Sequence, residues 1–283
     1  MAKFSFEFKR KFTQLTTALI YNANLKGFAD GLIYQGDIKG MCVPGLNCYS
    51  CPGAIGACPL GSLQVSNMSI VSKFPFYILG LLIVFGLFLG RIICGFLCPF
   101  GLVQELLYKI PTKKIKKNRV TKFLSNTKFL ILVLFVFILP VILQSPTFCK
   151  FICPAGTLGG AIPLLAKNEA LRGLIGALFS LKMSILVIIV ISSIFIYRIF
   201  CRFLCPLGAI YALFNKISIF GIAVNEHNCT HCNKCIKVCL MDIDEVGGRE
   251  CIQCGQCMSS CHFDAIYWKG MKNKEKENLI NEK

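Results

Sequence analysis

The chain has 283 residues, of which 55% are hydrophobic and only 16% are charged, and its mean hydropathy is +0.63. This composition excludes an ordinary soluble domain and indicates a membrane protein. The formal net charge of +17 does not indicate a nucleic-acid partner, because the Lys and Arg residues flank apolar runs or lie in a polar tail. The 18 cysteines recur at short spacings, which favours metal ligation over packing.

Four segments are candidates for membrane-spanning helices. In chain order they are residues 12–33, 74–93, 128–143 and 183–200. The last three are long and apolar enough to cross a hydrocarbon layer of about 30 Å. Pro140 lies near the end of the third segment and predicts an irregular or tilted helix there. The first segment is only moderately apolar and contains Lys26 and Asp30. We expect it to span the membrane, and an interfacial amphipathic helix is the alternative.

The loop between the second and third segments is strongly basic. The positive-inside rule therefore places it in the cytoplasm, and alternation of the spans places the C-terminal part there too. We expect a multi-pass cell-membrane protein whose residues 1–223 form a mainly α-helical, polytopic domain of three to four spans. The basic residues of the loop are Lys113, Lys114, Lys116, Lys117, Arg119 and Lys122.

Residues 224–270 are polar and cysteine-rich, and a Lys- and Glu-rich polar tail follows at 271–283. Two runs of Cys-x-x-Cys-x-x-Cys-x-x-x-Cys are typical of a bacterial ferredoxin-like α+β module with two 4Fe-4S clusters, in which the fourth cysteine of each run ligates the other cluster. Zinc is the alternative, but two complete four-cysteine runs disfavour it. Leu240 and His262 stand where ferredoxins usually have proline. The predicted sets are Cys229, Cys232 and Cys235 with Cys261, and Cys251, Cys254 and Cys257 with Cys239.

A short Cys-Pro-x-Gly unit recurs at Cys58, Cys98, Cys153 and Cys205, and Cys51-Pro-Gly is a degenerate copy. Proline stops one helix and can begin the next, so each unit is expected to be a helix break that presents a thiolate at the membrane surface.

Two Cys-x-x-x-Cys-Pro pairs follow the predicted spans that end in the cytoplasm. They are Cys94 with Cys98 and Cys201 with Cys205. A spacing of four places two thiolates on one helical face, and two pairs at the same depth supply the four cysteines of a cubane. We expect a third cluster there, and buried inert cysteines are the alternative.

Six cysteines fall on the opposite face. Cys149 and Cys153 with two of Cys48, Cys51 and Cys58 could hold a fourth cluster, which leaves a disulfide or spare thiols. Cys42 is the sixth of these cysteines. An extracytoplasmic disulfide is the alternative to the cluster.

With these motifs the sequence resembles the membrane-bound ferredoxin-type electron-transfer proteins, the family that includes NapH and the membrane parts of NosR-like proteins. The resemblance covers residues 74–268 and rests on the two cytoplasmic cysteine pairs, the spans between them and the eight-cysteine module. It implies electron transfer between a donor and a redox partner protein. NosR-like members also carry a flavin domain, whose length and attachment motif this chain lacks, so flavin is not expected.

The residue types that are missing narrow the function further. All three histidines lie in the C-terminal module, so haem in the membrane is not expected, and no P-loop or dinucleotide fingerprint is present. We expect an electron-transfer protein or oxidoreductase subunit that relays electrons between cytoplasmic ferredoxin clusters and membrane or extracytoplasmic clusters. Quinol oxidation that feeds a partner reductase and a metal-handling or cluster-assembly role remain the alternatives. The expected partners are membrane lipid, redox proteins and, in the second case, quinone. Glu105 is expected to be a solvated residue, with a quinol-site role as the alternative.

Overall fold

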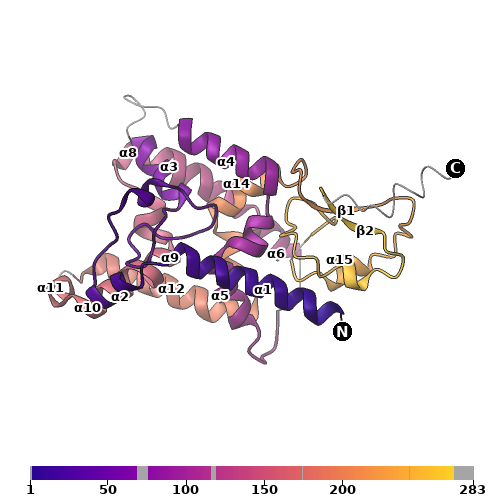
Figure 1. The fold of residues 1–283 in the computed structure, drawn as a ribbon, viewed down its shortest axis with the longest axis horizontal. Coiled ribbons are helices and arrows are strands. Elements are labelled where there is room, and N and C mark those ends of the chain that lie inside the picture. Colours follow the sequence, from indigo (N-terminus) through magenta and orange to yellow (C-terminus); the bar gives the residue numbers. More distant parts are fainter. Residues whose placement is uncertain (1, 69–75, 116–118, 174, 242, 271–283) are drawn as a thin grey trace.

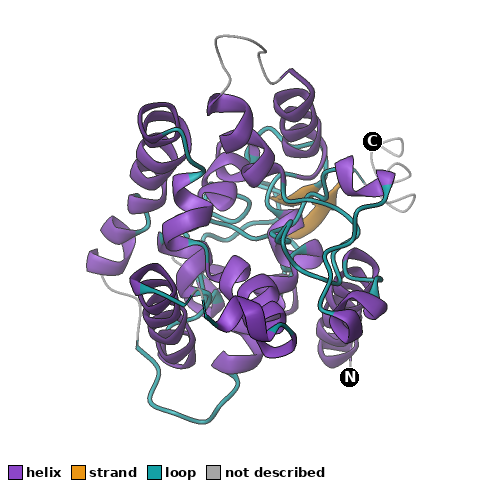
Figure 2. Cartoon of the chain, turned by 90° about the vertical axis from the view of Figure 1, so that its left-hand side faces the viewer, coloured by secondary structure: helices purple, strands orange, loops and turns teal. Residues whose placement is uncertain are grey.

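The computed structural model describes residues 2–68, 76–115, 119–173, 175–241 and 243–270. The fold is mainly helical, with 61% helix and 4% strand, as predicted. The helices form an elongated bundle, and a small C-terminal module that contains both strands lies at one end of it (Figure 1). Figure 2 views several of these helices end-on, so they run roughly along the long axis. The predicted polar tail, together with Lys116 and Lys117, lies outside the described residues.

The helices and strands have the following bounds. The bundle contains α1 Ala2–Tyr21, α2 Leu25–Asp30, α3 Pro59–Met68, α4 Phe76–Leu89, α5 Pro99–Tyr108, α6 Arg119–Leu124, α7 Thr127–Ile131, α8 Leu139–Leu143, α9 Pro154–Gly156, α10 Ile162–Lys167, α11 Glu169–Arg172, α12 Ala177–Phe195, α13 Ile199–Phe203 and α14 Pro206–Phe214. π-helical segments occupy Ile93–Leu97, Leu132–Ile138, Phe148–Ile152 and Thr157–Ala161, and 3₁₀ turns occupy Asp37–Gly40 and Met258–Ser260. The module contains α15 Lys234–Val238 and the antiparallel strands β1 Gly221–Val224 and β2 Ile266–Lys269, with Gly221 opposite Lys269.

Two helices in the described part of the chain are long and apolar enough to cross a membrane. The first is Thr121–Leu143, with 23 residues, which runs from within α6 through α7 and the π-helical segment to the end of α8. The second is α12, with 19 residues. Only 22% and 17% of their most apolar windows are buried, so most of their apolar surface faces outward, unlike that of a core helix in a soluble protein. The π-helical segment Leu132–Ile138 ends two residues before Pro140, which confirms the predicted irregularity, because proline has no N–H to continue the ladder.

α4 is shorter than the predicted span over residues 74–93, whose first two residues are not described. Its 14 described residues measure about 21 Å at 1.5 Å per residue. The helix ends at Leu89 because Gly90 takes a φ of +50°, a conformation that glycine adopts without steric cost. The described residues thus contain two helices of spanning length where the sequence predicts three to four spans.

The predicted single helix over residues 12–33 is wrong in its bounds. α1 ends at Tyr21, where the Asn22 side chain donates a hydrogen bond to the Ala18 carbonyl at 2.9 Å. A short α2 follows and closes at Gly31, whose φ is +66°. Asn22 and Asn24 favour turns because their side chains compete with the helix for backbone partners.

α1 has its polar and apolar faces reversed relative to a helix of a soluble protein. Its buried positions include Arg10, Gln14 and Thr17, whereas large apolar side chains are exposed. A surface helix in water buries the apolar face instead. The exposed apolar positions are Phe8, Phe12, Leu15, Leu19 and Ile20.

One hydrophobic core joins the bundle to the module. Leu82 of α4, Phe100 of α5 and Phe200 of α13 belong to the same buried cluster as Met241 and Ile252 of the module. The module is therefore packed against the bundle end, and its cysteine segments lie close to the helix breaks described next.

Candidate iron-sulfur centres

Four helices begin at a proline that follows a cysteine, namely α3, α5, α9 and α14. Cys98, Cys153 and Cys205 are all extended, with ψ values of 115°, 110° and 109°, as a following proline favours. The backbone N–H groups of Cys153 and Cys205 donate to the carbonyls five residues earlier, both at 2.9 Å. The predicted helix breaks are therefore present, and these three share one backbone conformation.

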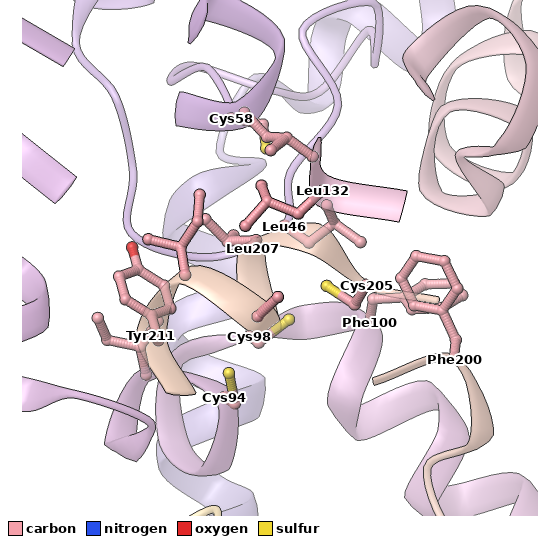
Figure 3. Close-up of a cluster of buried hydrophobic side chains, with 14 of the residues drawn as sticks. Leu46, Cys58, Cys94, Cys98, Phe100, Leu132, Phe200, Cys205, Leu207 and Tyr211 are labelled. Atoms are coloured by element: carbon pink, nitrogen blue, oxygen red, sulfur yellow. The ribbon is translucent and has the colours of Figure 1, made fainter. Parts of the chain in front are cut away.

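Cys94, Cys98, Cys201 and Cys205 line one small enclosed cavity. Each of these four cysteines is at most 8% exposed. Cys94, Cys98 and Cys205 lie close together below the aliphatic side chains of Leu46 and Leu207 in Figure 3. We call these four cysteines the inner set. The structure thus brings together two pairs that are more than 100 residues apart in the sequence.

The inner set suits a positively charged metal group. Burial raises the pKa of Cys201 to about 12, although Arg198 acts in the opposite direction. Bare thiols in this place stay protonated near neutral pH, whereas an iron cluster binds thiolates and displaces the protons. The Arg198 guanidinium adds a buried positive charge that would offset the charge of four thiolates.

A second group of cysteines gathers farther along the bundle. Burial raises the pKa of Cys149, and the neighbouring thiols of Cys153, Cys58 and Cys48 raise it further. Burial and then Cys48 raise the pKa of Cys153 to about 11. We call Cys48, Cys58, Cys149 and Cys153 the outer set. Figure 3 shows Cys58 separated from the inner cysteines by Leu46, Leu132 and Leu207.

The other two cysteines of this end have different neighbours. The Cys51 thiol lies 3.4 Å from the side-chain oxygen of Asn22, and the Cys42 thiol lies 3.6 Å from the hydroxyl of Ser62. No disulfide joins any of the 18 cysteines, all of which lie in the described residues. Of the three cysteines that the sequence left open, Cys48 and Cys58 are among the groups that raise the pKa of Cys149, whereas Cys51 is not among them.

Both predicted module sets are brought together. Cys229, Cys232, Cys235 and Cys261 line one cavity. In the other set, burial raises the pKa of Cys257, and the thiols of Cys251, Cys254 and Cys239 raise it further. The crossing of the fourth cysteine between the two runs is therefore present in the geometry. The antiparallel pairing of β1 with β2 brings the two ends of the module side by side.

A buried ionic network next to the inner set was missed from the sequence. Glu105 accepts hydrogen bonds from Arg10 at 2.6 and 2.9 Å, from Arg198 at 2.9 Å and from Tyr197 at 2.7 Å. The expectation that Glu105 is solvated is wrong, because it is only 3% exposed. Both arginines also donate to backbone carbonyls of the π-helical segment Ile93–Leu97, Arg198 to Cys94 at 2.5 Å and Arg10 to Gly95 at 3.0 Å. The network therefore holds the segment that carries Cys94.

Two buried glutamines were also missed. Gln64 donates to the Cys149 sulfur at 3.2 Å, and Gln104 donates to the Cys201 sulfur at 3.1 Å. A sequence signal was present, because each lies six residues after the cysteine of a Cys-Pro-x-Gly unit. Both sets thus have one cysteine that is hydrogen-bonded by an amide side chain.

Among the described residues, no three His, Cys, Asp or Glu side chains converge on a point that could hold a single metal ion. A cubane cluster makes a different demand, because it takes one thiolate at each of four iron atoms. Four cysteines around a shared space, as in the inner set, fit that demand. These residues would hold the cluster, which supplies one-electron redox chemistry.

The comparisons with known proteins agree with this fit. The model of a 4Fe-4S binding domain matches the chain three times, at residues 72–118, 126–168 and 181–222. Each match contains one Cys-x-x-x-Cys-Pro pair of the bundle. No solved structure matches the chain. The repeated unit is therefore recognised as an iron-sulfur motif independently of the ferredoxin-like module.

Several curated relatives are similar to most of the chain. An uncharacterized protein of Methanocaldococcus jannaschii is 33% identical over 65% of this chain and 74% of its own length. The putative electron transport protein YccM of Escherichia coli is 27% identical over 71% of this chain and 57% of its length. The ferredoxin-type protein NapH of Escherichia coli is 21% identical over 62% and 61%. The chain belongs to the family of ferredoxin-type 4Fe-4S electron-transport proteins.

Proposed function

We propose that the chain is a membrane-bound relay that passes electrons through four 4Fe-4S clusters. Two clusters would lie in the module, one in the inner set and one in the outer set. Iron-sulfur clusters suit this role because burial, hydrogen bonds and net charge tune their potentials over a wide range. The proposal rests on backbone contacts that connect the outer set to the inner set and the inner set to the module.

The inner and outer sets are linked by two consecutive residues. Burial and Cys94 raise the pKa of Cys98, and the backbone N–H of Leu46 lowers it. Burial and Cys153 raise the pKa of Cys58, and the backbone N–H of Asn47 is among the groups that lower it. Adjacent peptide groups therefore face one thiol in each set, which provides a short route between two clusters through two hydrogen bonds and the covalent bonds that join Leu46 to Asn47.

The module also packs directly against the inner set. Gly95 follows Cys94, and a Cβ built on Gly95 would stand 2.3 Å from the carbonyl oxygen of Ile252, the residue after Cys251. Arg91 also donates to Glu250 at 3.0 Å. A cluster on Cys251, Cys254, Cys257 and Cys239 would thus adjoin the inner cluster.

The membrane setting is supported by exposed apolar surface. The outward faces of Thr121–Leu143 and α12 are apolar, and contiguous exposed apolar surface of this kind needs a lipid or protein cover. Lys122 of the basic loop forms an ion pair with Asp244 of the module. The loop that favours the cytoplasm and the module therefore lie at the same end, and we place the module in the cytoplasm.

The test is anaerobic iron and sulfide quantitation with electron paramagnetic resonance on the detergent-purified chain. Four cubanes require about 16 irons per chain, and the double variant Cys149→Ser, Cys153→Ser should retain about 12. A value of about 8 irons that does not change in the variant would confine the clusters to the module and reject the relay.

Quinol oxidation is a second candidate, because a cavity adjoins the module and the inner network. Its volume is about 290 Å³, close to the lower limit of small-molecule sites. Aromatic side chains and Cys254, a predicted cluster ligand, line it, so a quinol ring bound there would adjoin a cluster. The aromatic lining comprises Phe6, Tyr108, Tyr197 and Trp268.

Reduction of the clusters by a short-chain quinol, followed by electron paramagnetic resonance, tests this candidate. Ser259 lines the cavity and is exposed, so Ser259→Trp should fill the cavity and slow quinol-dependent reduction while dithionite reduction is unchanged. If quinol does not reduce the clusters of the unaltered chain, quinol oxidation is rejected and the quinone-free relay is retained.

A further inference from the structure

Gln64 and Gln104 occupy equivalent places in the two bundle sets. Both residues are at most 1% exposed, and they come from different helices, α3 and α5. Each contacts the first cysteine of a Phe-Cys-x-x-x-Cys-Pro segment, Cys149 for Gln64 and Cys201 for Gln104. The same local arrangement therefore occurs twice in one chain.

The two side-chain amides make the same three hydrogen bonds to equivalent partners. Nε2 of Gln64 donates to the Cys149 sulfur at 3.2 Å and to the Leu60 carbonyl at 3.3 Å, and its Oε1 accepts from the Phe148 backbone N–H at 2.9 Å. Nε2 of Gln104 donates to the Cys201 sulfur at 3.1 Å and to the Phe100 carbonyl at 3.3 Å, and its Oε1 accepts from the Phe200 backbone N–H at 3.0 Å.

These contacts leave each amide one orientation. A flipped amide would point its oxygen at a carbonyl and at the sulfur, and would point its NH₂ group at a backbone N–H. The backbone N–H that holds Oε1 belongs to the residue directly before the cysteine. The donor is therefore fixed on the sulfur by the same segment that carries the sulfur.

A donor placed in this way distinguishes the charge states of sulfur. A neutral thiol is a weak acceptor, whereas a hydrogen bond to an ionised acceptor is roughly twice as strong. When a cluster gains an electron, negative charge on its sulfur atoms increases, so the N–H group stabilises the reduced form more than the oxidised form. Hydrogen bonds to sulfur are one of the factors that set cluster potentials.

We propose that Gln64 and Gln104 are paired positioning residues, each of which donates one amide hydrogen bond to a cluster thiolate and raises the reduction potential of its own cluster. This inference rests on the proposed inner and outer clusters. Gln104 would act on the inner cluster through Cys201, and Gln64 would act on the outer cluster through Cys149. A relay with two such donors keeps the two bundle clusters at related potentials.

The test is a redox titration of the full chain, followed by electron paramagnetic resonance, with the variants Gln104→Leu and Gln64→Leu. Each variant should shift one cluster to a more negative potential and leave the other unchanged, so that the second cluster is an internal control. Loss of one bond should change the ratio of reduced to oxidised cluster about tenfold at a fixed potential, which is about 59 mV for one electron. Gln14→Leu is a matched control, since it removes a buried glutamine with no hydrogen-bond partner among the described atoms.

If both leucine variants keep their clusters and the reduction potentials do not change, the inference is wrong, whereas the proposed relay is unaffected. If the unaltered chain lacks the inner and outer clusters, the proposed relay itself is rejected, and the inference is rejected with it. If the leucine variants lose iron, pulsed electron paramagnetic resonance of the unaltered chain labelled with ¹⁵N in glutamine side chains decides the question. Nitrogen coupling to both reduced bundle clusters supports the hydrogen bonds, and its absence overturns them.

Discussion

Gly95 lies directly against the backbone of Ile252, because a Cβ built on Gly95 would stand 2.3 Å from the Ile252 carbonyl oxygen. This glycine sits between the inner set and the module. The Gly95→Ala variant should push the two apart and lower stability by about 1–3 kcal/mol, the usual cost of overpacking. Freeze-quench electron paramagnetic resonance should show slower electron exchange between the module and the inner cluster.

Gly80 provides the matched control for this prediction. It lies in α4, and a Cβ there would meet no heavy atom within 4 Å, so Gly80→Ala should leave both stability and exchange intact. Equal exchange rates in Gly95→Ala and Gly80→Ala would show that the close approach at Gly95 does not govern the transfer.

The membership of the outer set can be tested one cysteine at a time. Cys48 is among the neighbours that raise the pKa of Cys149 and Cys153, whereas Cys51 and Cys42 face Asn22 and Ser62. Cys48→Ser should therefore remove about four irons per chain, and Cys51→Ser and Cys42→Ser should remove none. Loss of iron in Cys51→Ser with full retention in Cys48→Ser would reverse the assignment.

Glu105 should be essential for stability rather than for redox chemistry. Glu105→Gln would leave Arg10 and Arg198 buried beside a neutral amide, and breaking a buried ion pair costs about 3–5 kcal/mol. Denaturant unfolding in detergent measures the loss. Glu7→Gln is the control, because Glu7 pairs with Lys11 at the surface with 51% of its side chain exposed, where such pairs contribute less than about 1 kcal/mol.

The same carboxylate predicts a dependence on pH. Burial raises the pKa of Glu105, but Arg198, Arg10 and Tyr197 together lower it from 4.5 to about 2. A lowered pKa in the folded state means that the ionised group stabilises the fold above pH 4.5, and that this contribution is lost as the pH falls toward 2. The unaltered chain should lose stability over this interval more steeply than Glu105→Gln. Parallel curves for the two proteins would contradict the assignment.

The reversed faces of α1 predict contact with lipid. Phe12 is 60% exposed, and the chain has a single tryptophan, Trp268, in the module. In a Trp268→Phe background, the fluorescence of the tryptophan introduced by Phe12→Trp should be quenched strongly by lipids brominated in their acyl chains. The unaltered chain, with Trp268 alone, should be quenched weakly, and equal quenching of the two proteins would place α1 outside the bilayer.

Several local features of this protein are predictable from its amino-acid sequence. Cysteine spacing predicts the two module sets and the two inner pairs, because ligands of one cluster must fall at a few fixed intervals along a loop or helix. Proline after cysteine gave the helix starts at Pro99, Pro154 and Pro206, because proline constrains the backbone of its own residue and of the residue before it. The apolar runs 128–143 and 183–200 predicted the two long helices, although Thr121–Leu143 and α12 begin seven and six residues earlier than predicted.

The contacts between residues far apart in the chain depend on how the helices pack. The hydropathy of residues 12–33 predicted one helix, but α1 ends at Tyr21 and turns polar side chains inward, and an average over a window detects neither a break nor a face. Glu105 was expected in solvent because its two arginine partners lie 95 and 93 residues away. Gln64 and Gln104 hold the same place after a Cys-Pro-x-Gly unit, but their hydrogen bonds to the Cys149 and Cys201 sulfurs form only because their helices pack against those distant segments, and spacing within one chain segment does not predict such an approach.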